Sequence, residues 1–175
     1  MRVTIDGTEL DVAPGTTVLE AARAAGSAVP TLCFDDRLAP FGACRVCLVG
    51  AEGAPGPVPA CTTPCRDGME IDTRDPTARR VASAVVELVL SELPESPAPH
   101  TELAAVGREL AVGELRWRGT THVPDHDDRH PYLSFHHELC ISCGRCVRAG
   151  DAIPGAFALA ATSLGVHANV AAGIG

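Results

Sequence analysis

The chain has 175 residues, eight cysteines and a formal net charge of -8, and 46% of its residues are hydrophobic but 3% aromatic. This length allows one domain or two small ones, with a core built mostly from aliphatic side chains. The negative charge argues against a surface for nucleic acid or anionic lipid, because both carry negative phosphates. The N-terminus has no apolar stretch of signal-peptide length, so we expect a cytoplasmic protein.

The sequence up to residue 75 predicts a small α+β unit. Within residues 2–13, polar and apolar side chains alternate on either side of Asp6-Gly7, a pair that favours a hairpin turn. A short helix follows, which Thr16 or Thr17 can cap. Two further strands return toward the hairpin. The predicted helix and the two strands cover residues 18–25, 45–49 and 69–73.

A helical connector is predicted next. Asp75 suits an N-cap and Pro76 the first helical position, so a helix should run to about Glu92. A weaker helix should run from Thr101 to about Val112, followed by loop as far as residue 130 and a helical turn at 147–149. The apolar stripe of the first helix should contain Val81, Val85 and Leu88 with Ala82, Val86, Val89 and Leu93. We therefore divide the chain into residues 1–75, 76–112 and 113–175.

Four cysteines stand in a Gly- and Pro-rich stretch with the spacing C-x10-C-x2-C-x13-C. In a reducing compartment such a group favours metal binding over disulfides. Four thiolates can hold tetrahedral zinc or an iron–sulfur cluster, so the ligand count does not choose the metal. The candidate ligands are Cys33, Cys44, Cys47 and Cys61. Backbone N–H donors to their sulfurs are expected at Gly42, Ala43, Arg45 and Val46.

The choice of metal comes from a resemblance. Residues 41–47, FGACRVC, and residues 59–64, PACTTP, resemble the [2Fe–2S] ferredoxin-like domain that opens the large iron–sulfur subunit of respiratory complex I. Similar domains open NAD-linked hydrogenase diaphorase subunits and formate dehydrogenase α subunits. The resemblance implies a β-grasp fold for residues 1–75 and a [2Fe–2S] cluster on the four cysteines. Cys65 lies outside the motif and is expected to be a half-exposed spare thiol, with an auxiliary ligand as the alternative.

A second set of cysteines, Cys140, Cys143 and Cys146, resembles the ferredoxin motif C-x2-C-x2-C-x3-C of formate dehydrogenase α and hydrogenase subunits. In that motif three cysteines hold one [4Fe–4S] cluster and the fourth reaches a second cluster. Gly150 stands where the fourth cysteine belongs. Four outcomes are open: a [4Fe–4S] cluster with a non-cysteine ligand, a [3Fe–4S] cluster, completion by another chain, or no cluster. The candidate fourth ligands are His130, His136, His137 and Cys65.

Other features near these sets have plainer interpretations. In the families that the chain resembles, the connector carries a His-x3-Cys-x2-Cys site for a [4Fe–4S] cluster. The stretch after His100 has no cysteine, so we interpret that site as lost and place His100 at the surface.

Gly144 and Arg145 are expected to serve turn geometry and solubility alone. The tail after Asp151 carries no charge, but its glycines and Asn169 argue against a membrane span, and we expect no membrane association.

The leading functional interpretation is an iron–sulfur electron-transfer subunit. The sequence has no G-x-G-x-x-G phosphate loop and no ordered nucleophile and base, so we do not expect catalysis by this chain alone. By resemblance, the partner is a catalytic molybdenum or flavin/NAD oxidoreductase subunit. The alternative is a degenerate, non-redox module that is structural or stabilised by zinc. The chain could also be a fragment of a longer α subunit.

Overall fold

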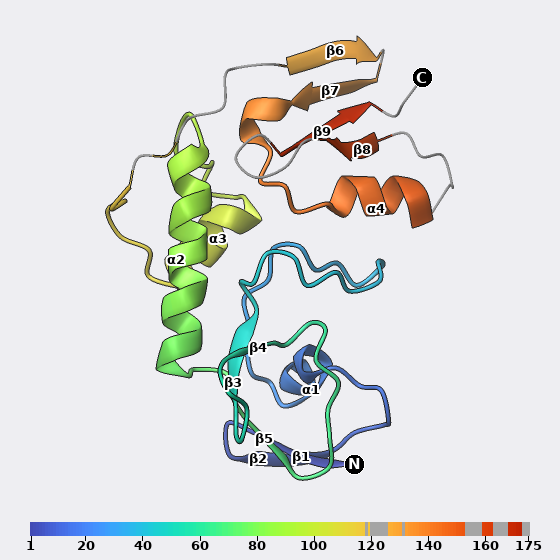
Figure 1. The fold of residues 1–175 in the computed structure, drawn as a ribbon, viewed down its shortest axis with the longest axis vertical. Helices are drawn as coiled ribbons and strands as arrows, with labels where there is room; N and C mark the ends of the chain where they lie inside the picture. The colour runs from blue at the N-terminus through green and yellow to red at the C-terminus, as the bar shows by residue number, and fades with distance from the viewer. Residues whose placement is uncertain (118, 120–125, 131, 153–158, 163–167, 173–175) are drawn as a thin grey trace.

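The computed structural model describes residues 1–117, 119, 126–130, 132–152, 159–162 and 168–172 (Figure 1). The N-terminal part forms β1 (Arg2–Ile5), β2 (Thr8–Asp11), α1 (Val18–Ala24), β3 (Leu48–Ala51), β4 (Val58–Pro59) and β5 (Met69–Asp72). The long helix α2 (Pro76–Glu92) and the shorter α3 (Glu102–Glu109) follow. The C-terminal part forms β6 (His126–His130), β7 (Leu133–His136), the 3-10 helix η1 (His137–Leu139), α4 (Arg145–Ala152), β8 (Leu159–Thr162) and β9 (Asn169–Ala172).

The first five strands form one mixed sheet in the order β2-β1-β5-β3-β4. β1 pairs antiparallel with β2 and parallel with β5, so strands from the two ends of this part lie side by side. Asp6 and Gly7 close the first hairpin with φ values of 50° and 83°, the left-handed geometry that a tight hairpin turn requires. This sheet, with the helix that packs on it, confirms the predicted α+β ferredoxin-like fold.

The short helix α1 packs on this sheet and is held at its N-terminus. Thr17, the second of the two predicted caps, accepts the Glu20 N–H at 3.3 Å, while the Glu20 carboxylate accepts the Thr17 N–H at 2.7 Å. Val18 and Leu19 are fully buried in the first hydrophobic core, together with apolar residues of the sheet. The Leu19 N–H also donates to the carbonyl of Ala60 at 3.0 Å. The helix therefore fixes the chain just before Cys61.

A second hydrophobic core joins α2 and α3 to the cysteine-rich loop between α1 and β3. Leu32 and Val46 come from that loop and pack with Val86 of α2. The remaining buried members of this core are Ala82, Leu103, Val106 and Leu110. Cys44 and Ile141, one from each cysteine segment, are partly buried against it. The second core is therefore the place where both cysteine segments meet the connector.

The buried face of α2 differs from the predicted stripe. Val81 and Leu88 are 38% and 50% exposed, so the prediction was wrong at these two positions. Ala82 and Val86 of the predicted stripe are buried, and the helix also turns Ala78 inward. Because the alanine side chains are short, α2 can lie close to β3, against which it packs. Asp75 caps the helix as predicted, since its carboxylate accepts the Ala78 N–H at 2.7 Å.

Several element bounds also differ from the predictions. β3 begins at Leu48 and not at Arg45, because Arg45 has a left-handed φ of 58° that a strand does not allow. β6 occupies residues 126–130, where loop was predicted, and α4 is longer than the predicted turn at 147–149. Part of the charge-free tail forms the antiparallel strands β8 and β9. In the described residues, no helix combines the length and apolar character needed to cross a membrane.

The Asp6 carboxylate links the first hairpin to two other parts of the N-terminal fold. It accepts hydrogen bonds from the N–H and the hydroxyl of Thr73, at 2.8 and 2.7 Å, and from the hydroxyl of Ser27 at 2.5 Å. Burial raises the pKa of Asp6, but these hydrogen bonds outweigh it and hold the pKa below its ordinary value. The stability that Asp6 supplies is therefore complete at neutral pH and is lost as the pH falls through the lowered pKa.

We expect Asp6→Asn to lower the free energy of unfolding at pH 7 by on the order of 1 kcal/mol, with a smaller loss at pH 2, below the lowered pKa of Asp6. Asparagine tolerates the left-handed turn, so the difference reports the carboxylate. Urea unfolding followed by circular dichroism at both pH values measures it. Glu9→Gln, on the exposed side of β2, is the control. An equal loss for Asp6→Asn at pH 7 and pH 2 would contradict this role.

Candidate metal centre

The four cysteines of the first set lie on loops that meet beside the sheet. Cys33 and Cys44 belong to the loop between α1 and β3, Cys47 directly precedes β3, and Cys61 follows β4. Cys33, Cys47 and Cys61 are at most 2% exposed, whereas Cys44 is half-buried. Cys47 and Cys61 pack within the first core. The sheet and α1 therefore fix two of the four positions directly.

The thiols of the first set meet in pairs. A hydrogen bond from the Cys44 thiol stabilises the Cys33 thiolate, which lowers the pKa of Cys33 to about 5 and raises that of Cys44. Burial raises the pKa of Cys47 to about 12, and its contact with Cys61 and the charge of Cys33 add to this. In the described residues, no three His, Cys, Asp or Glu side chains form a closed metal-binding group. The arrangement is therefore two thiol pairs that influence one another through charge.

Backbone N–H groups donate to these sulfurs. The N–H groups of Ala43 and Cys44 donate to Cys33, and that of Val46 donates to Cys44. Two of the four expected donors, Ala43 and Val46, are therefore confirmed. The other two positions supply left-handed turns, at Gly42 (φ 68°) and Arg45 (φ 58°). Four soft thiols in a largely buried loop with N–H donors fit an iron–sulfur cluster, in which such hydrogen bonds tune the potential.

The second cysteine set lies in and before α4. Cys140 and Cys143 are half-buried, and Cys146 in the first turn of α4 is more exposed. Desolvation, and then the charges of Cys143 and Cys140, raise the pKa of the Cys146 thiol. Ser142 and Gly144 take left-handed φ values of 51° and 68°, which turn the chain between the cysteines. Cys140 and Cys143 therefore lie close enough to Cys146 to act on its thiol electrostatically.

The two cysteine sets border the same cavity, which has a volume of about 210 Å³. Cys44 contributes from the first set and Cys143 from the second. The other lining side chains are mostly apolar and include Leu32, Val46, Val85, Val89 and Ile141. The connector helix α2 thus closes an apolar space between the two sets. The sequence placed these cysteines about a hundred residues apart and carried no sign that they adjoin.

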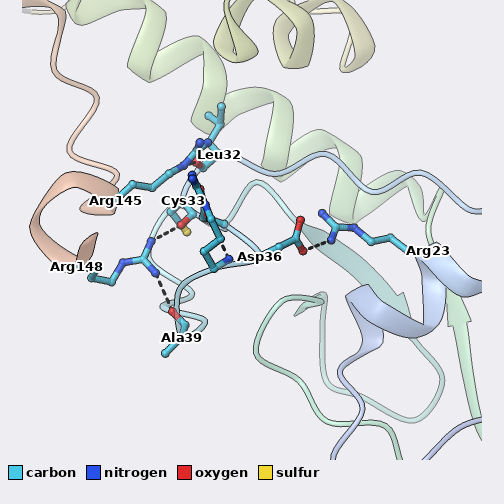
Figure 2. Close-up of polar contacts among 9 residues, drawn as sticks. Arg23, Leu32, Cys33, Asp36, Ala39, Arg145 and Arg148 are labelled. Atoms are coloured by element: carbon cyan, nitrogen blue, oxygen red, sulfur yellow. Dashed lines mark hydrogen bonds and ion pairs between the residues drawn. The ribbon is translucent and has the colours of Figure 1, made fainter. Parts of the chain in front are cut away.

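Arg145 fastens the second cysteine segment to the first loop (Figure 2). Its Nε donates to the carbonyl of Leu32 at 2.6 Å, and its guanidinium forms an ion pair with Glu102 of α3. The prediction that Arg145 serves solubility alone was wrong. The reason is that the first turn of α4 lies against the loop that contains Cys33, so Arg145 is half-buried and contacts Leu32.

Arg148, one turn further along α4, contacts the same loop. Its guanidinium donates to the carbonyl of Ala39 at 2.7 Å and to the carbonyl of Cys33 (Figure 2). No sequence motif singled out this residue. The available signal was its position three residues after Arg145, which places both arginines on one face of a helix. That signal is common on solvent-facing helices and does not by itself indicate a site.

The other candidate ligands have contacts of their own where the structure describes them. Cys65 was predicted to be half-exposed, but it is 5% exposed and packs in the first core, because its N–H bonds to Thr16 and brings this segment against α1. His136 Nδ1 lies 3.1 Å from Glu138 Oε1, and the His137 ring packs edge-on against Phe135 at 4.7 Å. His100 is exposed as expected, and the side chain of His130 lies outside the described residues.

Comparison with known proteins finds a family and several relatives. Residues 1–76 match a family described as a 2Fe-2S iron-sulfur cluster binding domain. The chain is 34% identical over 177 residues to a subunit of the NADH-quinone oxidoreductase of Rhizobium meliloti (strain 1021), covering 97% of this chain and 21% of that protein. It is 42% identical over 94 residues to the alpha subunit of the NADPH-Fe(3+) oxidoreductase of Geobacter sulfurreducens (strain DL-1 / KN400), covering 54% and 11%.

A solved structure is similar over nearly the whole chain. It is a chain of the NAD+-reducing [NiFe]-hydrogenase in the H2-reduced state, with a TM-score of 0.87 and 29% identity, covering 98% of this chain and 74% of that one. Together the fold, the cysteine loop and the family match define residues 1–76 as a [2Fe–2S] cluster-binding domain.

The chain is similar to iron–sulfur subunits of complex I and to a chain of an NAD+-reducing hydrogenase, which confirms the predicted resemblance. It spans about a quarter or less of the curated relatives' length.

Proposed function

We propose that the chain is the electron-carrying part of a multi-subunit oxidoreductase, with a [2Fe–2S] cluster on Cys33, Cys44, Cys47 and Cys61. The pairing of these thiols carries the proposal, since each iron of such a cluster takes two thiolates. The domain match over residues 1–76 supports iron over zinc. A bound cluster would supply one-electron chemistry. The chain itself supplies the thiolates, their N–H donors and a buried setting, and it is not catalytic alone.

The proposal includes a second, cubane-type cluster of the [4Fe–4S] or [3Fe–4S] kind on Cys140, Cys143 and Cys146. The closeness of Cys140 and Cys143 to the Cys146 thiol supports it. The cavity shared by Cys44 and Cys143 supports electron exchange between the two sets, because both sets border one mostly apolar space. A fourth ligand, where one is needed, would come from outside this set.

The partner that we propose is a flavin- or NAD(P)H-linked subunit. The names of the relatives, an NADH-quinone and an NADPH-Fe(3+) oxidoreductase subunit, support this choice. A molybdenum-containing, formate dehydrogenase-like partner stays a second proposal. We place the protein in the cytoplasm, because all eight cysteines are free thiols, as is usual in a reducing compartment. The proposed functional parts remain residues 1–75, 76–112 and 113–175.

Iron and acid-labile sulfide per chain, with paramagnetic resonance spectra before and after dithionite, test this function. Anaerobically purified protein should contain at least the iron and sulfide of one [2Fe–2S] cluster and give a signal on reduction. Additional iron with a second signal would support the cubane-type cluster. Zinc in place of iron, with no signal on reduction, would overturn the proposal and favour the zinc-stabilised interaction module.

A further inference from the structure

Arg148 contacts the first cysteine loop along an extended surface (Figure 2). Beside its two hydrogen bonds to the carbonyls of Ala39 and Cys33, its guanidinium carbon lies 5.3 Å from the centre of the Phe41 ring. Its Nε also donates to the carbonyl of Gly144 at 3.3 Å, which fixes the side chain to its own segment. One guanidinium therefore binds the loop at two points, Cys33 and Ala39. The first of these is a proposed cluster ligand.

Arg148 and Arg145 carry the same charge but differ in the groups around them. Arg145 forms an ion pair with Glu102, whereas in the described residues no carboxylate pairs with Arg148. Arg148 is half-buried, so water screens its charge less than at an open surface. Its positive charge is one of the influences that favour the Cys33 thiolate, after the hydrogen bonds from Cys44 and Ala43.

The charge of Arg148 should affect the reduction potential of a cluster on the first set. A cluster that accepts one electron becomes more negative by one charge, so a nearby cation stabilises the reduced form more than the oxidised form. Hydrogen bonding, burial and charge around the ligands set the reduction potential of iron–sulfur clusters. An arginine fixed on the Cys33 carbonyl should therefore raise this potential.

We propose that Arg148 is a positioning residue of the first cluster, which holds the Cys33 loop in place and raises the reduction potential of the cluster. The inference rests on the proposed function, because it needs a [2Fe–2S] cluster on Cys33. Arg148 follows Cys146 by two residues in α4. The potential of the first cluster thus depends on the folding of the second cysteine segment, through a contact between residues 115 positions apart.

A redox titration of the [2Fe–2S] resonance signal in the full chain tests the inference. We expect Arg148→Gln to make the potential more negative, with the equilibrium constant for reduction lowered up to tenfold, which is about 59 mV for one electron. Arg148→Lys keeps the charge but not the planar fork of donors. It should retain most of the wild-type potential and release iron to a chelator faster, because the loop is held less firmly.

Arg79→Gln is the matched control. Arg79 of α2 also donates to a carbonyl, that of Glu109 at 2.8 Å, so the substitution removes the same charge and the same kind of bond away from the Cys33 carbonyl. It should leave the potential unchanged. Arg145→Gln should shift the potential less than Arg148→Gln, because Glu102 already balances the charge of Arg145.

The possible outcomes separate the inference from the proposed function. A wild-type protein without a reducible [2Fe–2S] signal would overturn the function itself. A wild-type signal with equal potentials in Arg148→Gln and Arg79→Gln would overturn the inference alone. If Arg148→Gln binds no cluster while Arg148→Lys and Arg79→Gln do, a positive charge is required at this position and the inference stands. If Arg148→Lys shifts the potential as far as Arg148→Gln, the charge is not the cause and the inference fails.

Discussion

Replacing Cys47 by serine is expected to remove nearly all of the [2Fe–2S] signal. Cys47 is 2% exposed and pairs with Cys61 beside β3, so its substitution disrupts one of the two thiol pairs. The hard serine oxygen is a poor substitute for a soft thiolate toward iron in a sulfide cluster. Iron and acid-labile sulfide per chain, with the resonance spectrum after dithionite, measure the loss. Cys44→Ser should have a comparable effect, because it breaks the other pair.

Cys65→Ala is the control for this prediction. Cys65 is 5% exposed in the same core as Cys47, so its removal tests whether disturbance of the core alone can cost the cluster. Burial, and then the charge of Glu20, raise the pKa of the Cys65 thiol, which packs in the first core outside the four-cysteine motif. The variant should keep the wild-type iron and sulfide content. If it loses the signal while Cys47→Ser keeps it, the ligand assignment is wrong.

The largest loss of stability is expected from Leu19→Ala. Leu19 is fully buried between α1 and the sheet, so the substitution leaves a cavity that the surrounding strands cannot close completely. Such changes cost about 2 to 5 kcal/mol of unfolding free energy. The backbone of Leu19 also bonds to Ala60, next to Cys61, so the bound cluster should be lost at lower urea concentration. Circular dichroism and visible absorbance during urea unfolding measure both effects.

Leu88→Ala makes the same chemical change at an exposed site and serves as the control. Leu88 is 50% exposed on α2, so its loss removes little buried area. Surface substitutions of this kind usually change stability by no more than about 0.5 kcal/mol. The urea midpoint of Leu88→Ala should therefore stay close to that of the wild type. Equal midpoints for the two variants would show that α1 does not support the fold in the way that its burial implies.

The N-terminal fold could be predicted because its signals are local. The Asp6-Gly7 turn, the cap at Thr17 and the Asp75-Pro76 helix start each depend on neighbouring residues, and each is found in the structure. The predicted start of β3 was three residues too early. The β-prone residues suggested a strand from Arg45, but the turn of the cysteine loop extends to that residue. The exposure of Val81 and Leu88 was missed because periodicity gives a helix face but not the partner that it meets.

In the candidate site, too, the local features could be predicted from the sequence and the long-range contacts could not. Thiolate chemistry and spacing identified the two cysteine sets, because ligand type follows from residue type. The burial of Cys65 could not be read from its position after the motif, since it follows from the contact of this segment with α1. Arg148 was missed for the same kind of reason. Its partners are distant in the sequence, and a single arginine after a cysteine motif carries no distinctive pattern.

The sequence by itself determined the soft metal chemistry of this protein, the two cysteine sets and the α+β fold of its first part. These follow from residue type, spacing and periodicity, which act over short stretches of chain. Tertiary structure alone decided that Cys44 and Cys143 share a cavity and that α4 places Arg145 and Arg148 on the first loop. Those contacts depend on how α2 and α3 pack against both cysteine segments, and long-range packing leaves no periodic trace in the sequence.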